Sequence, residues 1–534
     1  MRSVPAPVEL PRRRDGCHET RSAPTCSLLL AAAACVGMAA CTVGPDYQPP
    51  DTPMPRDFAA ATSTTSRKTV GDRHSGGIVD PAAWWRALHD RELDALVDRA
   101  IAESPTLEVA LDRMQQARAQ VAMLVGVSLP MLQASEGGAL GSGSDLARGR
   151  VSQPLVSAEN GTGVSQVTNI VGFDAGWELD LFGKFRRGIE AAQYDVEAAV
   201  AARNVVLISL VADVTRAYLA MRALQTQLTV LRKNIGVAQH YVDFVQERFS
   251  RGITNELDVT LAQRELAQLQ SQIAPLSARI EAARNVIAAL VGAFPENIAR
   301  ELARPGTLPS LPGRILAGLP IDLLRRRPDI IEAERRLASA TALIGVATAD
   351  LFPQVVVSAS IGGQQGRGFT PAATSLIWSA GPGVNWPLLD FGTLDAAVEK
   401  ADFRTRELLF NYKQTVLNAV RDVDTAIGAY RAQQDRLHYL NSALAAARGA
   451  VSLAEQRFDR GLIDSLNVID AQRQLYSLEE QYVIAQESAA EQFVTLYKSL
   501  GGGWESYQNF PPFPRPLPAV VAAFKRLLAP NPAP

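Results

Sequence analysis

The chain has 534 residues, a formal net charge of −2 and 20% charged residues, a nearly neutral balance that gives no reason to expect nucleic acid as a partner. All four cysteines lie within the first 41 residues and the five histidines are scattered, so neither a disulfide framework nor a metal-ligand cluster is indicated. No convergent set of nucleophilic or titratable residues is evident either. We therefore expect a protein that is not an enzyme and that has no cofactor and no metal.

The first 40 residues are typical of a bacterial signal peptide. Several arginines precede an apolar stretch, residues 27–40, that is too short to span a bilayer as a helix. It ends in Met38, two alanines and Cys41, which resembles a lipobox with Cys41 as the lipid acceptor, although leucine is usual where Met38 stands. A plain secretory signal with an incidental cysteine is the alternative. Thr42, where an aspartate would favour inner-membrane retention, indicates sorting to the outer membrane.

The body of the chain contains an internal repeat. Residues 248–252 and their continuation match residues 457–461 and theirs, with about eleven of 24 aligned positions identical at an offset of about 209 residues. The same offset places residues 177–183 onto residues 386–392. We therefore expect two copies of one supersecondary unit. The predicted divisions are an extended segment at 41–82, a first repeat at 83–300, a second repeat at 301–505 and a proline-rich tail at 506–534.

Between the helices of each copy, two short segments alternate apolar residues with small or polar ones, which makes four such segments in the chain. Alternation with a period of two residues and one apolar face predicts strands. Tryptophan near a strand end is typical of a membrane interface. A half-buried sheet in a soluble protein is the alternative. Four strands cannot close a barrel and open edges are not viable in lipid, so membrane-embedded strands would require an oligomer. The glycine-rich stretches at 141–161 and 362–368 would then be outward loops. The predicted strands are about 131–142, 168–180, 353–363 and 377–389.

Each copy also contains one very long helix. Residues 184–250 and 393–459 lack proline, and a helix of about 67 residues is ~100 Å long. The following return helices, at 257–292 and 466–500, carry apolar residues at an alternating three-and-four spacing. This period of about 3.5 predicts left-handed coiled-coil packing. Pro275 is expected to kink the first return helix.

Five well-separated segments match one known family, at residues 41–47, 177–187, 319–334, 381–392 and 500–504. They resemble the TolC/OprM/NodT-type outer-membrane efflux lipoproteins. The resemblance implies a mainly α, TolC-like fold in a homotrimer, in which each subunit gives four strands to a twelve-stranded barrel and its long helices to a periplasmic tunnel. It implies an outer-membrane duct of a Gram-negative bacterium, anchored to lipid through an acylated, diacylglycerol-bearing Cys41. A periplasmic adaptor would join the duct to an inner-membrane pump, expected to be of the RND type, for export of small molecules.

The turns between each long helix and its return helix are the first candidate site. In the family they form the periplasmic tip that the adaptor contacts, whereas a bare structural turn is the alternative. A glycine in each turn suits the left-handed position after a helix end. The predicted adaptor-docking residues are Arg251, Gly252, Ile253 and Thr254 in one turn, and Arg460, Gly461, Leu462 and Ile463 in the other.

The second candidate site is a gate. Leu466 and Asp470 match positions that form constricting rings at the closed tip of OprM-like relatives, and three copies of Asp470 would attract cations. Relatives of the TolC kind have a second carboxylate where this chain has Asn467 and an arginine where it has Ile463, which puts a TolC-style salt-bridge latch in doubt. A solvated helix-surface aspartate is the alternative.

Two other functions remain open from the sequence. A type I protein-secretion duct would share the fold, and the lipoprotein-like start argues against it. A periplasmic coiled-coil scaffold would lack the alternating strands. The sequence does not identify the exported compound.

Overall fold

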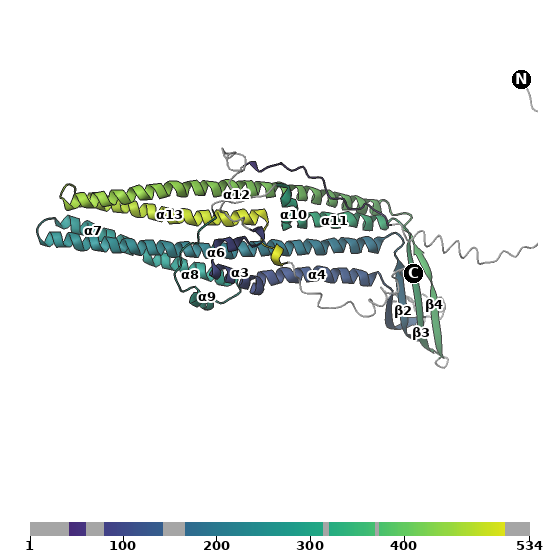
Figure 1. The fold of residues 1–534 in the computed structure, drawn as a ribbon. Helices are drawn as coiled ribbons and strands as arrows, with labels where there is room; N and C mark the ends of the chain where they lie inside the picture. Colours follow the sequence, from purple (N-terminus) through teal and green to yellow (C-terminus); the bar gives the residue numbers. More distant parts are fainter. Residues whose placement is uncertain (1–41, 60–79, 142–165, 313–319, 369–372, 508–534) are drawn as a thin grey trace, which may run out of the picture.

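The computed structural model describes residues 42–59, 80–141, 166–312, 320–368 and 373–507. The predicted signal peptide, Cys41 and the tail from residue 508 lie outside them. In the described part, long helices run beside one another along one axis, and a small sheet lies at one end, turned away from that axis (Figure 1). The predicted fold class, mainly helical with a small antiparallel sheet, is confirmed.

The four strands form one sheet in the order β1-β2-β3-β4, and every neighbouring pair is antiparallel. β1 and β4 therefore each keep one edge unpaired within the subunit. The expectation that residues 362–368 form a loop was wrong, because β3 continues through them. Backbone pairing with β2 and β4 persists there although the side chains no longer alternate. The bounds are Met131–Gly141 for β1, Gln166–Leu179 for β2, Gln354–Gly368 for β3 and Ala373–Asn385 for β4.

The two longest helices are α6, Lys184–Ser250, and α12, Thr393–Asp459, and each has 67 residues. α6 contains a window apolar enough to cross a membrane, but 56% of that window is buried inside the subunit, as in a core helix. The return helix of the second repeat is α13, Ser465–Leu500, which packs along both α12 and α6. The two repeats therefore form two helical hairpins that lie against each other (Figure 1).

The return helix of the first repeat is broken rather than kinked. α7, Glu256–Gln270, ends before α8, Ile273–Leu290, begins, and Pro275 lies in the first turn of α8. A proline ring clashes with the carbonyl group four residues earlier, which here belongs to Ser271 in the break. In the first turn of a helix the missing N–H of proline has no intrahelical partner to lose. The break therefore has its physical cause in Pro275.

Three further helices were not specified by the sequence patterns. These are α3, Arg91–Glu103, α4, Pro105–Val127, and α11, Pro328–Ala349. Asp90 caps α3 by accepting two backbone N–H groups, and α4 and α11 each begin with a proline, which tolerates the first helical turn. α4 packs on α6, and α11 lies between α6 and α12, so both accompany the long helices near the sheet (Figure 1). The shorter elements are η1 Pro81–Leu88, α9 Pro295–Glu301, η2 Pro320–Asp322, α10 Leu323–Arg326 and η3 Glu505–Tyr507.

The middle of the body has an aromatic core. Trp84 stacks on Tyr497 with ring centroids 5.6 Å apart and contacts Phe493 edge-on at 5.9 Å. Beside this cluster, an Arg327 guanidinium nitrogen donates to the Ser499 carbonyl group at 2.9 Å, which satisfies a carbonyl in the last turn of α13. The sequence motif around residue 327 and the glycine-rich motif at 500–504 are thus packed together.

Indole groups attach the sheet to the helices at corresponding places in the two repeats. Trp177 in β2 donates to the Ser128 carbonyl group, just before β1, at 3.1 Å. Trp386, just after β4, donates to the Leu351 carbonyl group, just before β3, also at 3.1 Å. These matched bonds join the sheet to the chain just after α4 and just after α11.

Candidate functional site

The two turns predicted as docking sites lie at the same end of the molecule, opposite the sheet (Figure 1). They share one backbone geometry, in which Gly252 and Gly461 have φ values of 71° and 68°. In the first turn the Ile253 N–H donates to the carbonyl group of Arg248, and in the second the Leu462 N–H donates to that of Arg457, both at 2.9 Å. This is the Schellman arrangement, and its left-handed position requires glycine.

Each turn presents an apolar side chain directly after its glycine. Ile253 is 58% exposed and Leu462 is 68% exposed. In the first turn, Arg251 forms an ion pair with Glu247, and the Thr254 hydroxyl donates to Asp258. In the second turn Arg460 is exposed and Ile463 is half-buried. The structure therefore brings the eight predicted docking residues into two similar, partly apolar tips.

The predicted gate residues lie just beyond the second turn, in the first two turns of α13. Leu466 is 60% exposed, and Asp470, four residues further on, is exposed and accepts a hydrogen bond from Gln474 at 2.9 Å. Val468 and Ile469 between them are buried. Leu466 and Asp470 therefore point away from the core of their own subunit, on one face of the helix.

An aromatic cluster behind the tip joins the two hairpins and was not predicted. Phe458, near the end of α12, is 7% exposed and lies 6.0 Å from the ring of Phe244 in α6. The Arg248 guanidinium group lies 5.0 Å from the Phe458 ring centroid, within cation–π distance. The repeat could have drawn attention to this position, because Phe249 is its equivalent. Phe249, however, is 44% exposed, so the two copies use this residue differently.

A polar seam between α6 and α13 was also missed by the sequence patterns. Glu479 of α13 has a side chain only 7% exposed, and it lies 3.5 Å from the ammonium group of Lys233 and 3.6 Å from the guanidinium group of Arg448. Asn234 of α6 donates to its other oxygen at 3.2 Å. A buried carboxylate is stable only when paired and hydrogen-bonded, so Glu479 ties both hairpins together.

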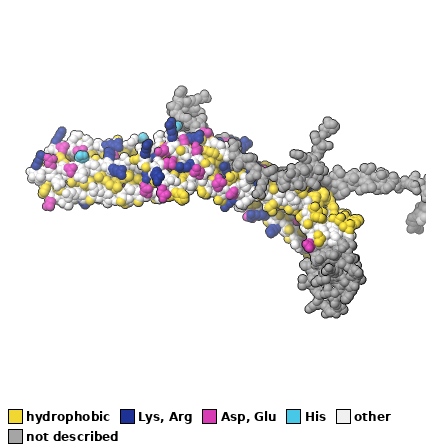
Figure 2. All heavy atoms as spheres, turned by 90° about the horizontal axis from the view of Figure 1, so that it is seen from below, with side chains coloured by type: hydrophobic (Ala, Val, Ile, Leu, Met, Phe, Trp, Pro, Cys, Tyr) yellow, Lys and Arg dark blue, Asp and Glu magenta, His cyan; other side chains and the backbone are white. Residues whose placement is uncertain are grey.

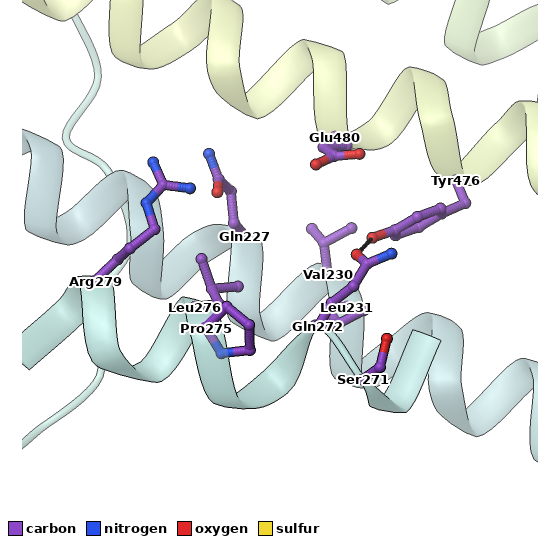
Figure 3. A pocket seen from close by; sticks show the side chains of 10 residues that line it. All are labelled: Gln227, Val230, Leu231, Ser271, Gln272, Pro275, Leu276, Arg279, Tyr476 and Glu480. Atoms are coloured by element: carbon purple, nitrogen blue, oxygen red, sulfur yellow. Dashed lines mark hydrogen bonds between the residues drawn. The ribbon is translucent and has the colours of Figure 1, made fainter. Parts of the chain in front are cut away.

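Beside this seam a cavity of about 340 Å³ lies between α6, α13 and the break between α7 and α8 (Figure 3). The Tyr476 hydroxyl donates to Gln272 in the break at 2.7 Å. Burial, with a smaller effect from the charge of Glu480, raises the pKa of Tyr476 to about 12. Tyr476 is therefore a neutral hydrogen-bond donor between the hairpins at physiological pH.

At the other end of the molecule, the first described residues are held by a buried arginine. The Arg187 side chain is 6% exposed and donates to the carbonyl groups of Val43 at 3.2 Å and Gly44 at 3.3 Å. It also forms an ion pair with Asp46 at 2.6 Å and another with Glu190 at 2.8 Å. The start of the segment that follows Cys41 is thus fixed to α6.

Close backbone contacts complete this attachment. A Cβ added at Gly44 would lie 2.4 Å from the Gly345 Cα of α11, and one added at Gly183 would lie 2.7 Å from the Thr42 side chain. Only glycine fits such an approach. Thr42 therefore lies beside the junction of β2 and α6, so the residue after Cys41 is at the foot of the sheet.

A sheet with one apolar face, joined through helices of 67 residues to two tips at the far end, defines a channel subunit that extends from a membrane. Among the described residues, no group of three or more His, Cys, Asp or Glu is arranged to hold a metal ion. A family model described as outer membrane efflux protein matches residues 96–293 and 319–502, and the chain belongs to this family.

Individual relatives agree with this assignment. Nodulation protein T of Rhizobium leguminosarum bv. viciae is 31% identical over 471 residues, which cover 88% of this chain and 92% of the relative. The pyoverdine export outer membrane protein OpmQ of Pseudomonas aeruginosa is 30% identical, over 85% of this chain and 94% of the relative. The solved structure of the outer-membrane channel OprN superimposes with a TM-score of 0.75 at 33% identity, and covers 87% of this chain and all of that one.

The comparisons confirm the predicted function as an outer-membrane efflux channel. The chain is the outer-membrane channel component of an efflux pump and not an enzyme. Outer-membrane efflux proteins of tripartite pumps act as trimers with adaptor and inner-membrane pump partners.

Proposed function

We propose that this protein is a lipid-anchored, homotrimeric duct of an RND-type efflux system, gated at its tip, that exports small toxic molecules. The observation that carries the proposal is the separation of an apolar-faced sheet from two matched tips by helices of 67 residues. At about 1.5 Å per residue, this is a reach of ~100 Å, which suits a duct that crosses a barrel and a periplasm. OpmQ is named for export of pyoverdine, a precedent for small-molecule cargo.

Two open edges of the subunit support the closure of a trimer. β1 and β4 each have one unpaired edge, and an unpaired edge cannot remain in lipid. On α12, Phe403, Phe410 and Leu417 follow a seven-residue spacing and are more than half exposed. We propose that this stripe packs against α4 of the next subunit. On α4 the exposed apolar residues are Val109, Met123 and Val127.

The gate is assigned to Leu466 and Asp470. Both point away from their own subunit near the tip, and three copies around one axis would make an apolar ring next to an anionic one. Opening follows when adaptor and pump bind the arrangement in which the tip helices are splayed.

The two tips are the proposed adaptor-docking surface. Ile253 and Leu462 supply exposed apolar contacts in equivalent positions, and the Schellman turns hold them rigidly. Leu462→Asp is expected to abolish copurification with the adaptor, whereas Leu453→Asp, at another exposed apolar position further up α12, is the matched control. Equal adaptor recovery with both variants would contradict the docking assignment.

Cys41 is the proposed lipid attachment site. The contacts of Arg187 with Val43 and Asp46 hold the segment after Cys41 at the foot of the sheet. Acyl chains on Cys41 would there enter the inner leaflet of the outer membrane. Growth with labelled palmitate should label the wild type and not Cys41→Ser. Arg187→Ala should keep the label but release Val43 to Asp46 to added protease. A labelled Cys41→Ser would contradict the assignment.

The experiment that tests the whole function is deletion and complementation in the host. Loss of the gene should raise sensitivity to small toxic compounds, and the wild type should restore resistance while Leu462→Asp should not. Loss of an exported protein with unchanged sensitivity would instead favour a type I secretion duct. No phenotype, together with failure to fractionate with outer membranes, would favour a periplasmic scaffold.

A further inference from the structure

One row of polar side chains runs across all four strands of the sheet. The register pairs Gln133 with Asp174, Asp174 with Ser360, and Ser360 with Ser379. Directly opposite residues of antiparallel strands share a face, so these four side chains lie on one face at one level. The Ser135 hydroxyl donates to Asp174 at 2.5 Å, and the hydroxyl oxygens of Ser360 and Ser379 are 2.8 Å apart. This row, here called the belt, carries one carboxylate per subunit and includes one hydrogen-bonded pair of hydroxyl groups.

The opposite face of the sheet is apolar at the neighbouring levels. Hydrophobic side chains gather over the sheet end of the molecule (Figure 2). Membrane barrel strands direct apolar residues toward lipid and polar residues toward the bore. The belt of Asp174 therefore faces the bore. The apolar rows on either side of it are Ala134, Phe173, Ile361 and Trp378, and Leu132, Ala175, Ala359 and Ala380.

The space next to the belt is open. Gly176 and Gly381 lie on the same face, two residues along their strands from Asp174 and Ser379, and a Cβ added at either would meet no atom within 4 Å. Among the side chains that the structure describes, Asp174 bonds to a neutral hydroxyl and forms an ion pair with no Arg or Lys. Its negative charge is thus available to ions that pass through the bore.

We propose that Asp174 is a specificity-determining residue of the channel, and that its three copies form an anionic ring in the barrel that favours cations over anions. This inference rests on the proposed trimeric duct and adds a second charged ring, at the other end of the pathway from Asp470. Charges act over about 10 Å in 0.1 M salt but only about 3 Å in 1 M salt. The selectivity due to Asp174 should therefore be strong in dilute salt and weak in concentrated salt.

The test is the reversal potential of the purified trimer in a planar bilayer under a KCl gradient. The background is Leu466→Ala with Asp470→Ala, which removes the proposed gate and its carboxylates. Asp174→Asn should lower the potassium-to-chloride permeability ratio about threefold near 0.1 M salt, and little near 1 M. Glu136→Gln is the matched control, because Glu136 pairs with Val171 on the apolar face and should leave the ratio unchanged.

An unchanged ratio in Asp174→Asn with normal conductance would overturn the inference. If the background trimer itself conducts nothing, the proposed duct fails instead, so the two failures are distinguishable. A second measurement tests the direction of the side chain. Asp174→Cys in proteoliposomes should react with a water-soluble thiol reagent, whereas Phe173→Cys should be protected by lipid. Protection of Asp174→Cys with labelling of Phe173→Cys would reverse the faces and contradict the inference.

Discussion

Glu479 offers a quantitative test of what holds the two hairpins together. Its carboxylate lies about 3.5 Å from two cations, and at an effective dielectric constant of about 20 each pair has a gross attraction of about 5 kcal/mol. The side chains of Lys233 and Arg448 are 66% and 60% exposed, so solvent reduces the net value to about 1 kcal/mol or less for each pair. Glu479→Gln keeps an acceptor for Asn234 but loses both ion pairs. Glu479→Gln should therefore weaken the attachment of α13 to α6 by about 1–2 kcal/mol.

Splaying of the tip helices would separate α13 from α6. Glu479→Gln should therefore destabilise the arrangement seen in the structure relative to the splayed, open one. A change of about 1.4 kcal/mol is tenfold in an equilibrium constant, and Glu479→Gln, present three times in the trimer, should raise the open probability at least about tenfold. The assay is single-channel recording of the purified trimer in a planar bilayer. Glu480→Gln, which changes the adjacent exposed carboxylate, is the control and should have little effect. An unchanged open probability in an intact Glu479→Gln trimer would refute the reasoning.

Two further predictions concern stability. Gly461→Val places a β-branched residue at φ 68° and should cost at least about 1–2 kcal/mol, seen as a lower Tm, whereas Gly449→Ala, inside α12 with open space around it, should raise Tm. A lower Tm in both the Gly461→Val and the Gly449→Ala variants would argue that left-handed backbone strain at residue 461 is not the cause. Burial raises the pKa of the Glu487 carboxyl group, so its charged form opposes folding at neutral pH. The wild type should gain stability as pH falls through that raised pKa, and the advantage of Glu487→Gln at pH 7 should vanish near pH 4; a pH-independent difference would contradict this.

The long helices could be predicted because their signals are local. The proline-free stretches have the bounds of α6 and α12, and the glycine in each tip turn has the left-handed φ that the sequence suggested. The break between α7 and α8 was expected as a kink at Pro275, and its position one turn earlier follows from the clash of the proline ring with the preceding turn.

Contacts between distant segments could not be predicted in this way. Arg187 and Asp46 are 141 residues apart, and Lys233 and Glu479 are 246 residues apart. No periodicity within one segment specifies such a partner. α4 was also missed, because part of its apolar surface is exposed in the subunit, so it lacks the single buried stripe of an ordinary amphipathic helix.

The most direct test of the central claim is conductance of the purified, lipid-bearing oligomer in a planar bilayer, after its mass has been determined. The account predicts a trimer that is mostly closed, with rare, small openings. It predicts that Leu466→Ala combined with Asp470→Ala gives larger and more frequent openings, because the apolar and anionic rings at the tip are removed. A double variant that conducts like the wild type would contradict gating at the tip, and a monomer without conductance would contradict the duct itself.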